Sequence, residues 1–349
     1  MKNLLTLLVA ILFTAGMSFA QSNIGNVTQS GESQKADVEQ TGGDIEAYVV
    51  QSNGFNVTDI TQINERLQEE NSILSNVNQS GVGNEAVIEQ THNGNLESRQ
   101  GPIESLVIQS GDGNKVLQVQ GPHGQLGITY AEVQQSGDQN IATQHQKRYG
   151  NDAFIHQSGN WNVANQAQDT YLLDDEEGSM GYVLIVQSGD GNLANQLQDG
   201  WSNDAEIHQS GSENVATQTQ YSWVSNAFIS QGGDWNTATQ DQDGNLNSAS
   251  IVQNSDGNTA TQDQVSGARR SGANYEDINY AEIAQWGGTN NVATQMQTSP
   301  GGDVVLNQAI IHQNGDWNTA VQTQTGFANF SNISQSGLGN MSTVTQFNN

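Results

Sequence analysis

The chain of 349 residues contains no cysteine, which excludes disulfide bonds, cysteine-ligated zinc and thiol catalysis. Hydrophobic residues are also scarce, at 34%, against about 45–50% in an ordinary globular protein. Glutamine, asparagine, glycine, serine and threonine take their place. Such a composition is typical either of disorder or of a fold stabilised by something other than an apolar centre. Because only 13% of residues are charged, the sequence favours the second interpretation.

Basic residues are few, with 9 Lys and Arg against 37 Asp and Glu, for a net charge of −28. Binding to nucleic acid by neutralising phosphates is therefore excluded as a function class. The same negative charge is expected to keep a secreted subunit soluble and to slow its self-association at low salt.

The first twenty residues differ in character from the rest of the chain. Lys2 precedes an apolar run over residues 4–13, and Ser18 and Ala20 place small side chains before a cleavage site between Ala20 and Gln21. This pattern predicts a secretory signal peptide over residues 1–20, with a membrane anchor as the alternative. No later segment is apolar enough to span a membrane. We therefore expect a secreted, extracellular protein.

An internal repeat runs through the rest of the sequence. Its first glutamine recurs with a base spacing of 22 residues and defines thirteen units. These glutamines, numbered as position 0 of each unit, are Gln29, Gln51, Gln79, Gln109, Gln135, Gln157, Gln187, Gln209, Gln231, Gln253, Gln285, Gln313 and Gln335.

Each unit follows one pattern around its first glutamine. Position −2 is Val or Ile in all thirteen units, position −4 is mostly small, and position +2 is Gly in all but two, where Asn53 and Ser255 replace it. Asn at +5, a small residue at +7 and a second Gln at +11 or +12 complete the frame. Alternation on both sides of Q-S-G-x-x-N predicts two strands. The Gly and Asn between them predict a tight arc with positive φ. Each unit is therefore expected to run as strand, tight arc, strand and looser turn.

A single unit cannot bury its inner face, whereas thirteen stacked units can. The sequence therefore predicts an all-β fold, a β-solenoid of thirteen strand–arc–strand repeats that form two facing parallel sheets. We expect rungs about 4.8 Å apart and sheets about 10 Å apart. The alternative, a disordered prion-like tract, does not explain the fixed spacing. One domain is expected over residues 21–349, with repeats starting near residues 23, 45, 73, 103, 129, 151, 181, 203, 225, 247, 279, 307 and 329.

The predicted interior holds Ala, Val or Ile, and Gln from one strand, and Asn, Ala, Gln and Gln from the other. A buried amide without a partner is costly, but a solenoid places the same amide above and below, so that each can donate to one neighbour and accept from the other. We expect Gln209→Ala to be damaging and a change at outward-facing Glu206 to be mild. The candidate ladder residues are Gln157, Asn162, Gln168, Gln187, Asn192, Gln198, Gln209, Asn214, Gln220, Gln231, Asn236, Gln242, Gln253, Asn258 and Gln264, and the arc glycines are Gly159, Gly189, Gly211 and Gly233.

The pattern Q-x-G-x-x-N-x-A-x-x-x-Q, with a branched apolar residue two places before the first Gln, resembles the curlin repeat of curli fibre subunits. Residues 157–168, 187–198 and 209–220 carry it most cleanly. The resemblance covers essentially all of residues 23–346. Where the family has Ser six residues before the first Gln, this chain usually has Asn, as at Asn151 and Asn203.

The resemblance implies an extracellular functional amyloid of the biofilm matrix, assembled from secreted subunits that support adhesion and cell aggregation. It also implies partners, namely a nucleator subunit, an outer-membrane secretion pore and periplasmic chaperones. This chain has far more repeats than well-known members. Those members carry a segment after the signal peptide that guides export, whereas strand-like sequence begins here at Asn23, so the resemblance does not identify the export signal of this chain.

Both ends of the predicted solenoid are expected to present open strand edges, since neither terminal unit resembles a polar cap. Matching open edges make head-to-tail contacts that do not close, and such contacts produce filaments. Enlarged connections fall between units and are expected on one edge of the solenoid. The charged segments within them, Asp174 to Glu177 and Arg269–Arg270, are interpreted as solvated loops in preference to a binding site for a cation, a partner or a surface. These connections lie near residues 63–72, 91–102, 121–128, 169–181, 265–276 and 298–306.

Other candidate chemistry is weak in this sequence. His156, His208 and His312 share the outward position −1 but belong to units that are not neighbours, so no metal site is expected. The S-G-D-G-N segments lack the spacing of calcium β-rolls. No catalytic constellation or cofactor is expected. Trp161 and Trp235 at +4 lie three rungs apart, too far to stack.

We therefore expect a non-enzymatic homopolymer without nucleic-acid or membrane partners. The alternative is a monomeric β-solenoid that binds ice or adheres to a surface, because threonines recur at +8, as at Thr217, Thr239 and Thr261. That row is broken at Asn165 and Asn195, which disfavours the flat, regular face that ice binding requires. A carbohydrate-cleaving β-helix would need clustered carboxylates, which the sequence does not show.

Overall fold

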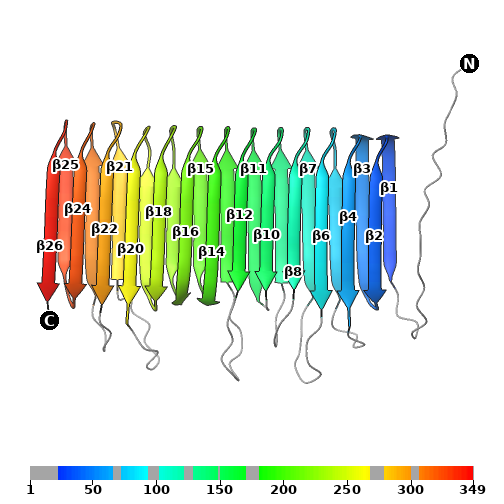
Figure 1. Ribbon diagram of the computed structural model, residues 1–349, viewed down its shortest axis with the longest axis horizontal. Helices are drawn as coiled ribbons and strands as arrows, with labels where there is room; N and C mark the ends of the chain where they lie inside the picture. Colours follow the sequence, from blue (N-terminus) through cyan, green and yellow to red (C-terminus); the bar gives the residue numbers. More distant parts are fainter. Residues whose placement is uncertain are drawn as a thin grey trace, which may run out of the picture.

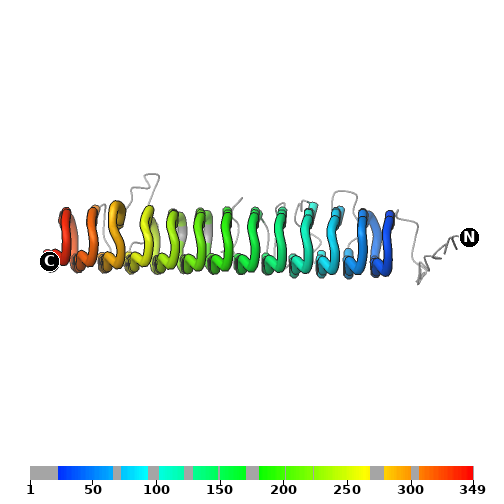
Figure 2. Tube along the Cα trace, turned by 90° about the horizontal axis from the view of Figure 1, so that it is seen from above, coloured from blue at the N-terminus to red at the C-terminus, as the bar shows by residue number. Residues whose placement is uncertain are grey.

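A computed structural model describes residues 23–65, 72–92, 102–121, 129–147, 150–169, 181–267, 279–299 and 306–348. Within these residues the chain forms a straight stack of two thirteen-stranded sheets, which we call sheet A and sheet B (Figures 1 and 2). Each strand pairs in parallel with the strand two places along the chain, so that odd strands form sheet A and even strands form sheet B. The predicted all-β solenoid with two facing parallel sheets is confirmed.

Strands in both sheets are short and of similar length. Sheet A contains β1 (Ile24–Glu32), β3 (Ile45–Gly54), β5 (Ile73–Gln79), β7 (Ile103–Ser110), β9 (Thr129–Ser136), β11 (Asn151–Ser158), β13 (Gly181–Ser188), β15 (Asp204–Ser210), β17 (Asn226–Gln231), β19 (Asn247–Gln253), β21 (Asn279–Trp286), β23 (Asn307–Asn314) and β25 (Phe330–Ser336). Sheet B contains β2 (Lys35–Gly42), β4 (Val57–Asn64), β6 (Glu85–His92), β8 (Lys115–Gly121), β10 (Ile141–Lys147), β12 (Val163–Asp169), β14 (Leu193–Trp201), β16 (Val215–Trp223), β18 (Thr237–Gly244), β20 (Thr259–Ser266), β22 (Val292–Ser299), β24 (Thr319–Gly326) and β26 (Met341–Asn348).

The register between neighbouring strands places equivalent repeat positions opposite each other. Gln187 is paired with Gln209 and Ile185 with Ile207 across β13 and β15. A shift of one residue would turn every buried side chain to the solvent, so the alternating pattern fixes this register strongly. Identical side chains therefore lie above one another along the whole stack.

The apolar core is narrow and consists mostly of two residue types. Branched residues at −2 from sheet A and alanines at +7 from sheet B belong to one buried cluster, as Ile207 and Ala216 illustrate. Alanines at −4, such as Ala205, are also buried, and most of the remaining interior is filled by Gln, Asn and Ser. This division explains how a chain with 34% hydrophobic residues forms a continuous core. The largest fully buried side chains are Ile45, Ile60, Ile73, Ile88, Ile155, Ile185, Ile207, Ile229, Ile251, Ile283 and Ile311.

The arc between the two strands of a unit requires glycine at +2 for two reasons. Gly159, Gly189, Gly211 and Gly233 have φ values between +83° and +99°, a region that only glycine adopts readily. A methyl group on Gly211 would also overlap the carbonyl oxygen of Gly233 in the next rung. The arcs lie along the upper edge of the stack in Figure 1.

The second turn of each unit is tighter than expected where no insertion enlarges it. Ser202, Val224, Leu246 and Ala328 have φ values of +57°, +58°, +60° and +52°, as position +4 of the arc has. The sequence from Gln198 to Asn203 also repeats the arc pattern Q-x-G-x-x-N. A 22-residue unit is therefore built from two similar halves of 11 residues, one for each turn.

Several predicted features lie outside the described residues. These are the signal peptide with its cleavage site at Ala20 and Gln21, the stretch from Asp174 to Glu177, the Arg269–Arg270 pair, and most of each enlarged connection. Strands that flank the connections reach the edge opposite the arcs (Figure 1). In the described part of the chain, no helix has the length and apolar character needed to cross a membrane.

Candidate functional site: amide ladders and end rungs

Glutamines at position 0 form a chain of hydrogen bonds through the interior beside sheet A. Nε2 of Gln157 donates to Oε1 of Gln187 at 2.8 Å, Gln187 to Gln209 at 2.8 Å, and Gln209 to Gln231 at 2.9 Å. The same bond joins every consecutive pair from Gln29 to Gln335. All donors point toward the C-terminal end of the stack, which gives the ladder a direction.

A second ladder of glutamines at +11 runs beside sheet B. Gln168, Gln198, Gln220 and Gln242 donate in turn to the next rung at 2.9–3.2 Å. Gln264 is the next member and donates to Gln297 at 2.8 Å. The row also starts in the first unit and ends in the last, and its donors point the same way.

The second N–H of these amides connects the two sheets. Gln209 in sheet A donates to the carbonyl oxygen of Leu193 in sheet B at 3.0 Å, and Gln198 in sheet B donates to that of Tyr182 in sheet A at 3.0 Å. Both donor hydrogens of each side chain are therefore used. A satisfied buried hydrogen bond contributes about 0.5–1.5 kcal/mol, whereas an unsatisfied partner costs about 1–3 kcal/mol.

Asparagines at +5 connect rungs in two ways. The expected amide-to-amide bond is present in several units, as where Nδ2 of Asn192 donates to Oδ1 of Asn162 at 3.1 Å, and bonds to the main chain add to it. The backbone N–H of Asn192 donates to Oδ1 of Asn162 at 3.0 Å, while Nδ2 of Asn162 donates to the carbonyl oxygens of Ser158 and Gly189 at 3.2 and 2.7 Å. The same backbone bond joins Asn192 to Asn214. It is repeated from Asn214 to Asn236 and from Asn236 to Asn258. The short asparagine side chain stays at the arc and fixes its conformation there.

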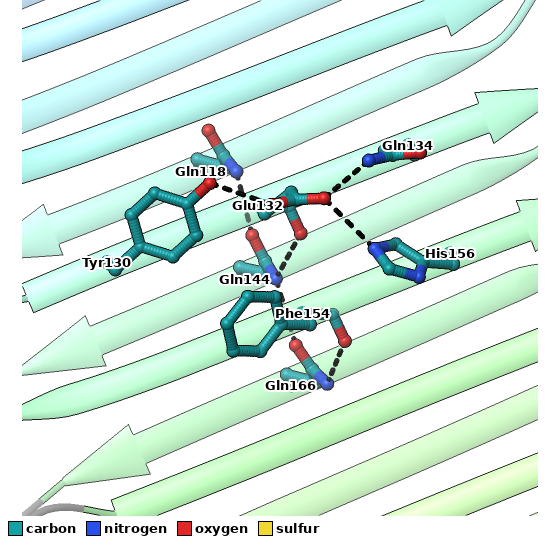
Figure 3. Close-up of polar contacts among 8 residues, drawn as sticks. All are labelled: Gln118, Tyr130, Glu132, Gln134, Gln144, Phe154, His156 and Gln166. Carbon is teal, nitrogen blue, oxygen red and sulfur yellow. Dashed lines mark hydrogen bonds and ion pairs between the residues drawn. The ribbon is translucent and has the colours of Figure 1, made fainter.

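A third glutamine ladder, at +9, is absent from the candidate residues named from the sequence. It runs from Gln118 through Gln144 and Gln166 to Gln322, as Figure 3 shows for its first three members. Gln144 also donates to the carbonyl oxygen of Glu132 in the facing sheet at 3.1 Å. The alternation +5, +7, +9, +11 was sufficient to identify this row, which the end units interrupt with Val or Ile.

Asparagines at −6 form another row that sequence reasoning missed. Nδ2 of Asn307 donates to Oδ1 of Asn279 at 3.1 Å, and the backbone N–H of Asn329 donates to Oδ1 of Asn307 at 3.0 Å. The preference for Asn at this position was visible in the sequence. Its meaning follows from the 11-residue half-repeat, in which −6 is the counterpart of +5.

Outside the ladders, the outer face of sheet A carries a polar cluster around Glu132 (Figure 3). The Tyr130 hydroxyl donates to Oε2 of Glu132 at 2.7 Å, and His156 Nε2 lies 3.1 Å from Oε1. Burial alone would raise the pKa of Glu132, but hydrogen bonds from Tyr130, His156 and Gln134 outweigh it and lower that pKa.

The same arrangement recurs six rungs later, where Tyr280 and His312 contact Glu282 at 2.8 and 3.1 Å. Burial and the hydrogen bond to Glu282 raise the pKa of Tyr280 to about 12. His156 and His312 thus lie outward and far apart, as their repeat position predicted. Among the described residues, no three His, Asp or Glu side chains are grouped to hold a metal ion.

The two end rungs differ from the interior because each strand there pairs on one side only. At the C-terminal end, Leu338, Met341 and Phe347 are 74%, 80% and 72% exposed. Nε2 of Gln346 donates to the carbonyl oxygen of Phe330 at 2.8 Å, and within the described residues it has no glutamine above it. The two end rungs are therefore the places where the glutamine ladders end. Because all their hydrogen bonds run in one direction, the two ends of each ladder differ.

Comparison with known proteins supports the resemblance seen in the sequence. Residues 307–337, which span β23, β24 and β25, match the family model of the curlin associated repeat. No curated protein matches the chain. The matched segment covers unit 12 and the first part of unit 13, and the same frame of glutamines recurs in the other eleven units.

Proposed function

We propose that this chain is a secreted, non-enzymatic structural subunit that stacks end to end into an extracellular, curli-like amyloid fibre of the biofilm matrix, where it supports adhesion and cell aggregation. Its premise is the curlin associated repeat matched at residues 307–337, a repeat of a structural family. The observation that carries the proposal is the complementarity of the two end rungs in hydrogen bonding, shape and charge.

Hydrogen-bonding direction favours one way of joining two copies. At the C-terminal face, Oε1 of Gln335 and of Gln346 accepts from the rung before, which leaves the amide N–H side for a following rung; at the N-terminal face, Nε2 of Gln29 and of Gln40 donates to the rung after, which leaves the Oε1 side. In the single chain, Nε2 of Gln335 bonds Oγ of Ser342 at 3.2 Å, a bond that it would exchange for the next glutamine. Stacking unit 13 of one copy on unit 1 of the next would continue both ladders without a break. Two identical faces brought together would oppose donor to donor or acceptor to acceptor.

The interior of the end rungs is also matched. At +9, where nine central units have Gln, unit 13 has Val344 and unit 1 has Val38. Both are partly buried and pack against the same core cluster. A junction in the proposed register would place Val344 on Val38 and Ile333 on Val27, so these branched residues would meet branched residues and the glutamine ladders would keep their partners.

Charge at the junction is low for so acidic a chain. Residues 317–349 contain no Asp, Glu, Lys, Arg or His, although the whole chain carries −28. Unit 1 carries Glu32, Asp37, Glu39 and Asp44 with one Lys35. An uncharged C-terminal face therefore avoids the like-charge repulsion that would oppose stacking.

Replacing the glycine at +2 of the last unit gives a test that separates assembly from folding. Inside the stack, a methyl group at +2 would overlap the next rung, as at Gly31 against Asn53. No rung among the described residues lies beyond Gly337, and a methyl group there would approach only Nδ2 of Asn340 at 3.9 Å. In a fibre it would meet the carbonyl oxygen of Gly31 in the next copy. Gly337→Ala should therefore fold and fail to assemble.

Gly339→Ala is the matched control, because its φ is +69° and nothing lies within 4 Å of an added methyl group. Position +4 also tolerates side chains in other units, such as Trp317. The mature chain and the Gly339 variant should form thioflavin-positive filaments with a meridional reflection near 4.7 Å in fibre diffraction. A wild-type chain that stays monomeric at high concentration, or a Gly337 variant that assembles at the normal rate, would contradict the proposal.

The curlin resemblance suggests partners that handle such a subunit before assembly. A nucleator subunit, an outer-membrane secretion pore and periplasmic chaperones belong to this part of the proposal, as does removal of residues 1–20 on export. N-terminal sequencing of fibres collected from the cell surface tests the last point. Fibre protein that begins at Gln21 is the expected result, and one that retains Lys2 would overturn it.

A further inference from the structure

Four aromatic side chains stand on the arc edge, all at position +4, and none belongs to the core. Phe55, Trp161, Trp235 and Trp317 are 58%, 62%, 63% and 63% exposed. Their backbones are fixed, since the N–H of Trp161 donates to the carbonyl oxygen of Asp138 at 3.0 Å and the other arcs repeat this bond. Packing within the subunit therefore does not explain these rings.

The local backbone also disfavours them. Their φ values are +58°, +62°, +58° and +58°, a left-handed conformation that is rare for bulky residues and relaxed for glycine. Glycine occupies the same position in five other units, as at Gly83 and Gly191. Unfavourable conformations of this kind are concentrated at functional sites, which points to a role for these rings outside the fold.

The neighbours of each ring follow a fixed order along the edge. The rung before each aromatic carries a polar residue at +4, and the rung after it carries glycine. The polar residues are Ser33, Gln139, Glu213 and Asn290, and the glycines are Gly83, Gly191, Gly257 and Gly339. Each ring therefore has a hydrogen-bonding group one rung away on one side and a position without a side chain on the other.

The rings lie on a straight line at intervals of three or four rungs. Trp161, Trp235 and Trp317 are separated by three rungs each, or about 14 Å at about 4.8 Å per rung, and Phe55 lies four rungs, or about 19 Å, before Trp161. The arcs follow a straight course in both views of the molecule (Figures 1 and 2). An extended ligand could contact several rings without bending.

We propose that this row of rings, Phe55, Trp161, Trp235 and Trp317, binds an extended, uncharged polysaccharide. Sugar rings have apolar C–H faces and polar hydroxyl edges, and an exposed indole offers a flat apolar surface for the face. The carboxylate of Glu213 and the amides of Gln139 and Asn290 lie one rung away, where they can bond hydroxyl groups.

Other classes of partner fit this edge less well. A protein surface or a second copy lying alongside requires a contiguous apolar patch, whereas these rings are isolated by about 14 Å. A polyanion such as a nucleic acid or an acidic polysaccharide is repelled by a chain of charge −28. Carboxylates also lie beside the rings at +3 of the arcs, as at Asp138, Asp234 and Asp316.

The geometry makes binding depend on ligand length. A single stacked ring is a weak contact, and simultaneous contact with several rings raises the apparent affinity because later contacts become intramolecular. A short oligosaccharide reaches one ring, while a long chain reaches three or four. The row is complete within one copy, so the inference does not require fibre assembly.

The test uses the unassembled mature chain in native gels that contain soluble hydroxyethyl cellulose, with polygalacturonate as an anionic comparison. Wild type should be retarded by the uncharged polymer and not by the anionic one. Replacing Trp161, Trp235 and Trp317 together by glycine should weaken binding about tenfold or more, and cellotetraose should compete poorly. Val224→Gly, at a residue of φ +58° in the opposite turn, is the matched control and should leave the retardation unchanged.

Because glycine is relaxed at this position, the triple variant should fold with a urea midpoint no lower than that of wild type. The proposal is overturned if neither hydroxyethyl cellulose nor xyloglucan retards the wild-type chain, or if the triple variant is retarded equally. If the triple variant loses only the bundling of filaments, the rings mediate contacts between copies and the polysaccharide proposal is wrong.

Discussion

Unit 8 in the middle of the stack and unit 13 at its end share one frame but not one set of constraints. Gly211 and Gly337 have nearly the same φ, +99° and +97°. Only the first would force an added methyl group against the backbone of another rung. The requirement for glycine at +2 therefore comes more from the backbone of the following rung than from the φ angle of the residue itself.

The largest expected difference between the two units is at this glycine. Gly211→Ala adds a left-handed alanine and a backbone clash, and should destabilise the chain by about 3 kcal/mol or more. Gly337→Ala adds only the conformational cost, about 1–2 kcal/mol. Urea unfolding, with hydrogen exchange of the amides in units 7 to 9, measures the first effect.

If the two variants prove equally stable, the clash with the next rung is not what selects glycine at +2. If the arc of unit 8 moves to accept the methyl group of the Gly211→Ala variant, amide hydrogen exchange should become faster at Gly233 and stay unchanged in units further away.

The next largest difference concerns the amide ladder. Gln209→Ala removes bonds to Gln187, Gln231 and the carbonyl oxygen of Leu193, and should cost about 2–4 kcal/mol through unpaired groups and a cavity. Gln346→Ala removes one ladder bond and one carbonyl contact at an exposed end, and should cost less than about 1 kcal/mol. Equal losses in urea unfolding would mean that the ladder contributes little beyond space filling.

A smaller difference lies on the outer face of sheet B. Asp241 and Asp263 lie in register on neighbouring strands, while the end of the stack has Thr323 and Thr345 at the equivalent position. Burial first, and nearby carboxylates second, raise the pKa of Asp241 and Asp263. An acid with a raised folded pKa favours the native state at low pH, and this contribution is lost as pH rises through that pKa.

Asp263→Asn should therefore raise stability at pH 7 by about 0.3 kcal/mol after allowance for solvent screening. Near pH 3, where both carboxyl groups are largely protonated, the gain should vanish. Thermal unfolding at the two pH values measures this effect, and Thr345→Asn at the end of the stack supplies the comparison. A gain in the free energy of unfolding that is larger at pH 3 than at pH 7 would contradict a raised pKa for Asp263.

The smallest expected effect is at Glu206, which lies outward on β15 and contacts His208 at 3.3 Å on the same strand. Glu206→Gln should change stability by less than about 0.5 kcal/mol. A loss as large as that of Gln209→Ala would remove the distinction between inward and outward positions within the central unit.

Most of the fold follows from the sequence because one pattern is repeated thirteen times. Alternation around Val or Ile at −2 identifies the strands, and glycine at +2 identifies the arc. The register follows, because equivalent residues such as Gln187 and Gln209 must meet if the buried face is to stay buried.

What the sequence did not yield concerns contacts that a pattern alone cannot assign. The asparagine at +5 was expected to bond the next side chain, and Asn192 does bond Asn162 in this way. Its short side chain also reaches the main chain of the arc, as Asn162 does at Gly189, and this contact was not expected. The second turn was expected to be loose because insertions there obscured the motif between Gln198 and Asn203. Reading the 22 residues as two halves of 11 would have revealed both this turn and the row at −6.

The hydrogen bonds of every rung lie along the long axis of the stack, and this has a mechanical consequence for the proposed fibre. Within one copy, neighbouring rungs are joined both by these bonds and by the covalent chain that passes from one rung to the next. Between copies, only the non-covalent bonds remain. A fibre pulled along its axis should therefore break between subunits, and its fragments should have lengths that are multiples of about 60 Å, the height of thirteen rungs.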